Sequence, residues 1–354
     1  MLLDAIVMPL LFLLSGVFDT LCTQKLVYLG ASSMRSMWSI FAYYFAQMLI
    51  GLSPIHFSDS QSAVHMEMDD EIQFLSSDSD SEDGKSKYSK GGAFSKLSLL
   101  YLSSALLDIC GYVIRTIGMV YCGSGLFQVA FSSVAVFSAL YSRVFLKTYI
   151  SSVQWLGIII VTGGLVISPL SSATTGASPV TGILLTLLGA QFYAVSYIVN
   201  EIISRIPGNK GSKEICKRVG IINTAICCLV ICVDTLPNRN TLIFEPIAKK
   251  NATITRVFQA TLVYIVSHIV HSYALYSVQG SLGAIWTGLL QCIRACVVFV
   301  SSHYLYCSTD PNQCLTTSKI ASTVLVCAGI LVFTTGKQKV ERVLLPSAPS
   351  MEEL

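Results

Sequence analysis

Charged residues are scarce in this chain. Asp, Glu, Lys and Arg make up only 12% of its 354 residues, whereas they make up about 25% of an average soluble domain. Hydrophobic residues account for 53%, and the mean hydropathy is +0.65. This composition excludes an ordinary soluble domain. It predicts an all-α polytopic membrane protein, because a bilayer favours repeated apolar helices of about 20 residues.

Sequence motifs for catalysis and nucleotide binding are also absent. The chain contains no GxxxxGK[ST], no GxSxG and no HExxH, which are the patterns of a phosphate-binding loop, a hydrolase nucleophile and a zinc protease. We therefore expect no enzyme, no ATP-driven transport, no cofactor and no metal. The net charge of +3 suits helix ends that face an anionic leaflet, so we expect no nucleic-acid partner.

Long hydrophilic stretches are lacking, with one exception at residues 53–96. This segment holds nine of the 20 acidic residues and only four lysines. It is rich in serine and poor in apolar residues, which predicts a disordered cytosolic loop. Acids follow its serines closely, which makes three of them candidate sites for an acidophilic kinase: Ser77, Ser79 and Ser81.

The apolar runs predict ten membrane-spanning helices, each near the length that crosses a bilayer. They form two sets of five with similar spacing, and an odd number per set gives the two sets opposite orientations, an arrangement typical of transporters. Residues 1–52 hold spans one and two, 97–170 hold spans three to five, 180–336 hold the second repeat, and 337–354 form a cytosolic tail. The spans are 3–22, 35–52, 97–117, 122–145, 152–170, 180–204, 218–236, 257–279, 281–304 and 317–336.

Loop charges predict that both termini are cytosolic. With that orientation, 14 Lys and Arg residues of the loops lie on the cytosolic side and seven on the other, as the positive-inside rule requires. The glycosylation sequon at Asn251 then lies on the non-cytosolic side. So do Cys307 and Cys314, which could form a disulfide in an oxidising lumen. We expect an internal membrane: Golgi, endoplasmic reticulum, lysosome or vacuole.

Polar residues inside the spans are the candidate substrate-binding or pathway residues, because charge within a bilayer is costly and usually functional. The alternative for each is a structural pair with a neighbouring helix. For the two histidines that alternative is favoured over a role in carrying protons, and for Glu201 an ion pair with Arg205 is favoured. The primary set is Asp19, Asp108, Arg115, Gln128, His268, His271 and Arg294, and the secondary set is Lys25 and Glu201.

Five glycines in or beside the spans allow helices to approach closely. Packing is the expected role for all of them, and those in the CGSG and GSLG sequences are also candidates for gating. They are Gly123, Gly125, Gly163, Gly164 and Gly283.

The run ALLDICGYVIRTIGMVYCGSGLFQVAFSS, followed by a basic break, QWLGI and GGLVI, resembles the drug/metabolite transporter superfamily. It is most similar to the F subgroup of solute carrier family 35, relatives of nucleotide-sugar transporters. Similar matches are SGVFDTLCTQK, QFYAVSYIVNE and LLQCIRACVVF. The resemblance places Asp108, Gln128, Lys25, Glu201 and Arg294 at polar positions of the family pattern. Relatives tend to carry an arginine shortly after the FQ, where this chain has Phe131 and Ser132.

The resemblance implies a secondary-active carrier that moves a small polar or anionic metabolite across a lipid bilayer by alternating access. One alternative is an exporter of cationic solutes, amino acids or peptides, similar to the chloroquine-resistance-transporter branch. Another is a receptor or scaffold that transports nothing. A homodimer is left open as the assembly.

Overall fold

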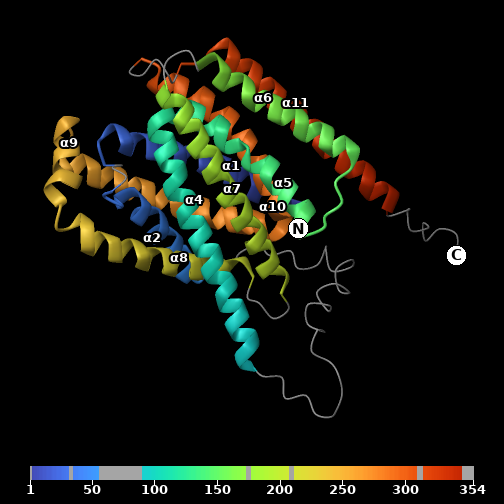
Figure 1. Cartoon of the computed structure of the whole chain (residues 1–354), viewed down its shortest axis with the longest axis horizontal. Coiled ribbons are helices and arrows are strands. Elements are labelled where there is room, and N and C mark those ends of the chain that lie inside the picture. Colours follow the sequence, from blue (N-terminus) through green and yellow to red (C-terminus); the bar gives the residue numbers. More distant parts are fainter. Residues whose placement is uncertain are drawn as a thin grey trace.

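The computed structural model describes residues 2–31, 35–55, 90–172, 177–206, 211–308 and 314–344. Within these ranges every regular element is a helix (Figure 1), as the composition predicts. Most of the acidic loop, with Ser77, Ser79 and Ser81, lies outside the described residues, as does the end of the tail.

The described helices overlap the predicted spans, but their bounds differ from them. Two short π-helical segments, Ile231–Thr235 and Asn240–Phe244, connect α8 to α9. The α-helices are α1 (Leu2–Tyr28), α2 (Trp38–Leu52), α4 (Lys90–Ser132), α5 (Val134–Phe145), α6 (Ser152–Ser172), α7 (Ala177–Arg205), α8 (Ser212–Val230), α9 (Glu245–Lys249), α10 (Ile254–Tyr306) and α11 (Thr317–Leu344).

Helix α10 folds back on itself at Gly283. Its 53 residues are interrupted there by φ 80° and ψ −179°, a conformation that glycine adopts readily because it has no Cβ. His271 and Arg294 would lie about 35 Å apart along a straight helix, yet their side-chain nitrogens are 3.4 Å apart. The break separates two antiparallel segments where the sequence predicts spans eight and nine.

Helix α4 is also bent sharply. A single helical element runs from Lys90 to Ser132, yet the Arg115 guanidinium carbon lies 5.3 Å from the centre of the Phe131 ring. A straight helix would place these two residues about 24 Å apart. The chain therefore reverses between them, near the predicted turn at Gly123 and Gly125, whose side-chain surroundings lie outside the described part of the structure.

Each helix of the first half packs mainly against the second half. α4 lies along α7, α1 along α10, α2 along α8, and α6 along α11, while α5 packs on both α7 and α10. In Figure 1 the α6 and α11 pair forms one side of the molecule, and α2 and α8 lie together on the other. Helix pairs thus join the two halves, and the centre of the molecule lies between one half and the other.

The outer surface of the bundle is apolar. Six helices are long and apolar enough to cross a membrane, including the folded-back α10, and three shorter apolar helices accompany them: Trp38–Leu52, Ala130–Phe145 and Ser152–Gly164. Large apolar side chains such as Leu14, Phe18 and Val266 remain exposed on this surface. The chain is an integral, multi-pass membrane protein, because only lipid can cover so much apolar surface.

Glycines bring α6 and α11 into direct backbone contact. A Cβ on Gly157 would lie 2.7 Å from the carbonyl oxygen of Gly329, and a Cβ on Gly164 would lie 3.0 Å from that of Ser322. Gly163 behaves differently from our expectation, because a Cβ there would have no described atom within 4 Å. Its face of α6 is exposed, so Gly163 does not pack against another helix.

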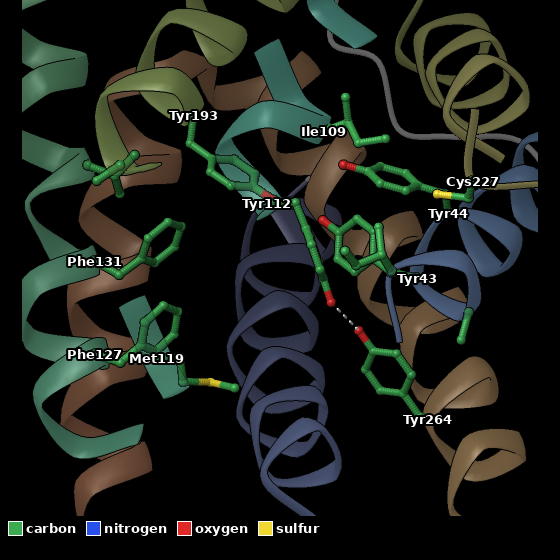
Figure 2. Close-up of a cluster of buried hydrophobic side chains, with 14 of the residues drawn as sticks. Tyr43, Tyr44, Ile109, Tyr112, Met119, Phe127, Phe131, Tyr193, Cys227 and Tyr264 are labelled. Atoms are coloured by element: carbon green, nitrogen blue, oxygen red, sulfur yellow. Dashed lines mark hydrogen bonds between the residues drawn. The ribbon is translucent and has the colours of Figure 1, made fainter. Parts of the chain in front are cut away.

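An aromatic core fills the space between the halves (Figure 2). Tyr43 and Tyr112 contact each other with tilted rings, whose centres are 4.4 Å apart, and the hydroxyl groups of Tyr112 and Tyr264 are 3.2 Å apart. Phe127 and Phe131 lie on the returning segment of α4, opposite Tyr193 of α7. Of these residues, Tyr43, Phe127, Phe131 and Tyr193 line the site described next.

Candidate functional site

A polar cavity lies where α1, α2, α4, α7 and both segments of α10 meet. The room in it for water-sized molecules is about 40 Å³, which is enough for one or two waters and too little for a metabolite. No metabolite fits in the cavity in this conformation. Its walls are Asp19, Thr20, Thr23, Tyr43, Arg115, Met119, Phe127, Phe131, Tyr193, Tyr197, His271, Leu275, Gln291 and Arg294.

Arg115 of α4 is surrounded by aromatic rings. Its guanidinium carbon lies 4.4 Å from the ring centre of Tyr112, 5.2 Å from that of Tyr193 and 5.8 Å from that of Phe127. Its Nε donates to the Tyr193 hydroxyl at 3.2 Å. Aromatic faces stabilise a cation without neutralising it, so Arg115 keeps its full charge at the cavity wall.

Arg294 of the second α10 segment lies beside His271 of the first. Arg294 Nη1 is 3.4 Å from His271 Nε2, and His271 Nδ1 is 3.1 Å from the Ser15 hydroxyl. The Nε of Arg294 is buried and has no hydrogen-bond partner among the described residues. The structure also gives Arg294 no ion pair with a described carboxylate, so the structural pair considered from sequence is not formed there.

Asp19 of α1 pairs with His268 of α10. The distance from His268 Nδ1 to Asp19 Oδ1 is 3.1 Å, and the histidine side chain is completely buried. The imidazole ring also contacts the Tyr43 ring, which is tilted by 34° to it, with ring centres 3.8 Å apart. Asp19 lines the cavity, whereas His268 lies directly behind it.

Two more predicted residues adjoin the cavity without lining it. Gln128 Nε2 donates to the Thr20 hydroxyl at 3.2 Å. Asp108 is buried beside Tyr44, and its Oδ2 has no hydrogen-bond partner among the described residues. Asp108 and Arg115 were expected to share one polar patch, but the arginine turns toward Tyr193 instead.

The two secondary residues lie elsewhere. Lys25 is exposed at the end of α1, as an interfacial anchor would be. Glu201 accepts a hydrogen bond from the backbone N–H of Ala284 at 2.8 Å. It therefore caps the α10 segment that begins after Gly283, a contact that the expected pairing with Arg205 did not anticipate. The side chain of Arg205 lies outside the described part.

Sequence reasoning missed the aromatic and neutral polar walls of the cavity. Tyr43, Tyr193 and Tyr197 are ordinary residues in apolar runs, and nothing in their spacing alone separates them from core residues. The only signal is that Tyr193 and Tyr197 are four apart, on one face of α7, next to the polar Gln191 and Asn200.

The structure supplies a cation where the resemblance suggested that one is missing. Phe131 replaces the arginine usual in relatives, but the Arg115 guanidinium lies 5.3 Å from its ring. Ser132 donates its hydroxyl to the Gln128 carbonyl within the same helix. The cavity thus has two arginines, Arg115 and Arg294, although residue 131 is a phenylalanine.

Cys307 and Cys314 form a disulfide. His303 lies beside them, and its ring nitrogen and the two sulfurs are within 4.8 Å of one another. Sulfurs joined in a disulfide are not thiolate ligands for a metal. Asn251 is exposed in the turn before α10, with φ 50°.

Comparison with known proteins finds a match to a transporter family in one part of the chain. Residues 76–169, which include Asp108, Arg115 and Gln128, match the EamA-like transporter family. The resemblance to drug/metabolite transporters is confirmed. The EamA-like segment ends near the close of α6, so it covers the first set of helices after the acidic loop and leaves the second set unmatched.

Two curated relatives were found. An uncharacterised protein of Schizosaccharomyces pombe is 30% identical over 126 residues, which cover 33% of this chain and 39% of the relative. Solute carrier family 35 member F6 of Mus musculus is 29% identical over 111 residues, which cover 29% of this chain and 30% of the relative. The chain therefore matches less than half the length of either relative. The likenesses to the EamA-like family and to the solute carrier are to transporters and not to enzymes, as expected from the absent catalytic motifs.

A solved crystal structure shows that the fold is known. It superposes with a TM-score of 0.57 over 95% of this chain and 98% of its own, at 11% sequence identity. At that identity the likeness concerns the arrangement of helices alone.

Proposed function

We propose that the chain is a secondary-active carrier that moves a small anionic metabolite by alternating access. The observation that carries this proposal is the presence of two arginines, Arg115 and Arg294, at one cavity between the two halves. Guanidinium groups suit carboxylate and phosphate, because their planar donors match those oxygens.

The hydrogen bonds of the arginines favour an anion as the substrate. Arg294 Nε is buried with no described partner, and a buried donor without a partner costs free energy until something accepts from it. Arg115 is held by aromatic faces and one tyrosine hydroxyl, so its charge remains available. An anion in the cavity would accept hydrogen bonds from both.

The same features support a carrier over a receptor or scaffold. In a non-transporting protein we would expect the intramembrane charges to be paired within the helix packing. Here Asp19, Arg115, His271 and Arg294 line one cavity, and this cavity lies between the halves, where an inverted-repeat carrier binds its substrate.

The packing pattern supports ten spans in two inverted repeats. The count of ten takes α10 as two spans and joins the returning end of α4 with α5 as span four. The contact of α4 with α7 then corresponds to span three on six, and that of α1 with α10 to span one on eight. In two repeats of five spans, span one is equivalent to span six, span two to span seven, and so on. Exchange of the repeats therefore turns the contact of spans three and six into the contact of spans eight and one. The remaining contacts join equivalent spans of the two repeats: α2 with α8, α6 with α11, and α5 with the second segment of α10. Rocking of the halves about the cavity then opens it to alternate sides.

The proposal includes an internal membrane and cytosolic termini. It is supported by the loop charges and by the disulfide at Cys307 and Cys314, which suits an oxidising lumen. The exposed Asn251 is on the same side in this orientation.

Uptake into proteoliposomes tests the function. The purified protein is assayed with radiolabelled glutamate, citrate, inorganic phosphate and uridine monophosphate, and with lysine and choline as cations. We expect uptake of at least one anion and of neither cation. Arg294→Gln and Arg115→Gln should each weaken that uptake about tenfold to hundredfold, which corresponds to the ~1.5–3 kcal/mol of a hydrogen bond to a charged group.

Arg143→Gln is the matched control, because Arg143 is exposed at the end of α5 and should leave uptake unchanged. Size-exclusion profiles of all variants separate loss of binding from loss of folding. Uptake of cations only would favour the exporter of cationic solutes, and anion uptake that survives both cavity variants would refute the role of the arginines.

A further inference from the structure

We propose that His268 Nε2 is a proton-binding site and that the carrier takes up one proton together with its anion. This inference rests on the proposed function, because it names the ion that accompanies the substrate at the same cavity. It depends on the difference between two neighbouring histidines, His268 and His271.

The hydrogen bonds of His268 fix where its proton lies. Its Nδ1 is 3.1 Å from Asp19 Oδ1, and a carboxylate only accepts hydrogen bonds, so Nδ1 carries the hydrogen. In the neutral ring Nε2 then bears a lone pair. That nitrogen is buried and has no hydrogen-bond partner among the described residues, so a second proton can bind there.

His271 has the opposite arrangement. Its Nε2 faces Arg294 Nη1 at 3.4 Å, and arginine only donates, so Nε2 must accept and cannot carry a hydrogen. Nδ1 then donates to the Ser15 hydroxyl at 3.1 Å. A second proton on His271 would make its Nε2 a donor that faces the Arg294 donor. It would also place a positive imidazolium beside the positive guanidinium. His271 is therefore held neutral, and His268 is the only one of the two that can gain a proton.

A carboxylate and an aromatic ring contact His268 directly. Asp19 Oδ1 lies 3.1 Å from Nδ1, and the centre of the Tyr43 ring lies 3.8 Å from that of the imidazole. The titratable and charged groups that face His268 are Asp19 of α1, Tyr43 of α2, Asp108 of α4, and Tyr264 and His271 of α10.

The charge of the site explains why proton and anion would move together. Two arginines and two aspartates, Arg115, Arg294, Asp19 and Asp108, balance one another when both histidines are neutral. A monoanion brings one negative charge into a buried space, where net charge is costly. A proton from the aqueous phase on His268 Nε2 restores the balance. The same proton leaves Nε2 for water when the cavity opens on the other side.

Nitrogen NMR of the full chain in lipid nanodiscs tests the proton site without any substrate. With ¹⁵N-labelled histidine, we expect the Nε2 signal of His268 to change from the unprotonated to the protonated form when the buffer is made acidic. The His271 signals should not change under the same conditions. His268→Gln, whose amide can still donate to Asp19, assigns the signal by removing it. A His268 ring that stays neutral down to pH 5 would overturn the proposal.

Proton movement is then followed in proteoliposomes that contain a pH-sensitive dye. Glutamate, citrate, inorganic phosphate and uridine monophosphate are added one by one, each with and without an acidic exterior. An anion that is taken up should acidify the interior, and the acidic exterior should increase its uptake several-fold. His268→Gln should keep exchange of the anion across the membrane but lose the response to pH. His303→Gln, outside the cavity, is the control.

These outcomes separate the two proposals. If none of the four anions enters, the proposed substrate class fails, and the NMR titration still decides the proton site. If an anion enters without interior acidification, or if His268→Gln keeps the pH response, the carrier stands and the proton site is refuted.

Discussion

Substitution of Gly157 by alanine tests the packing of α6 on α11. The new Cβ would lie 2.7 Å from the Gly329 carbonyl oxygen and 2.7 Å from the Phe333 nitrogen. Both are backbone atoms that cannot rotate away, so the helices must separate by roughly 0.7 Å to reach an ordinary van der Waals contact. Overpacking of this kind costs about 1–3 kcal/mol.

The gain in helix propensity offsets part of that cost. Alanine is about 1 kcal/mol more favourable than glycine within a helix, which leaves a net loss of ~1–2 kcal/mol for Gly157→Ala. Gly163 lies further along α6, and an alanine Cβ at its position would have no described atom within 4 Å. Gly163→Ala therefore keeps only the gain, and we expect it to be neutral or slightly stabilising.

A thiol-reactive dye on the heated protein measures the difference. Cys292 and Cys296 are buried in the apolar cluster that also contains Val161 of α6 and Phe333 of α11, so they react when this cluster opens. Gly157→Ala should lower the midpoint of dye labelling by a few degrees, and Gly163→Ala should not. A midpoint for Gly157→Ala at or above that of the native chain would refute the reasoning, as would an equal loss for Gly163→Ala.

Two further predictions concern the helix break at Gly283 and the orientation of the chain in the membrane. Glu201→Ala removes the acceptor for Ala284 N–H and should destabilise the protein by ~1.5–3 kcal/mol. Glu201→Gln, which keeps a carbonyl acceptor, should lose about half as much in the same dye assay; equal midpoints for all three proteins would argue against the cap. Epitope tags at both termini should be accessible after selective permeabilisation of the plasma membrane, and Asn251→Gln should remove a glycan seen as a mobility shift. A protected tag would reverse the orientation.

The apolar runs and loop charges predict much of the fold because membrane helices obey a local rule. A span needs about 20 apolar residues and satisfies its own backbone hydrogen bonds, so its place can be read without knowledge of its neighbours. The turn near Gly283 is an example, since its two flanking runs are each long enough to span. The superfamily resemblance is likewise carried by contiguous residues, and the match over residues 76–169 bears it out.

The roles of the polar residues could be predicted only in part. Intramembrane cost singles out Asp19, Arg115, His271 and Arg294, which do share one cavity. The cost of placing polar groups in a membrane could not show that Glu201 caps a distant helix segment. Nor could it show that Gly163 faces open space while Gly164 touches α11. Those facts depend on which face of each helix meets which partner.

The sequence by itself determined that this chain is a multi-pass helical membrane protein. It also determined which polar residues lie inside the spans, where the free-energy cost of insertion implies that each has a role. Only the tertiary structure decided what the scarce polar residues do, because their partners come from other helices. It supplied Arg115 where Phe131 seemed to leave no cation. It also distinguished His268, which faces a carboxylate, from His271, which faces an arginine. Three residues apart in the chain, the two histidines differ only in the neighbours that folding brings to them.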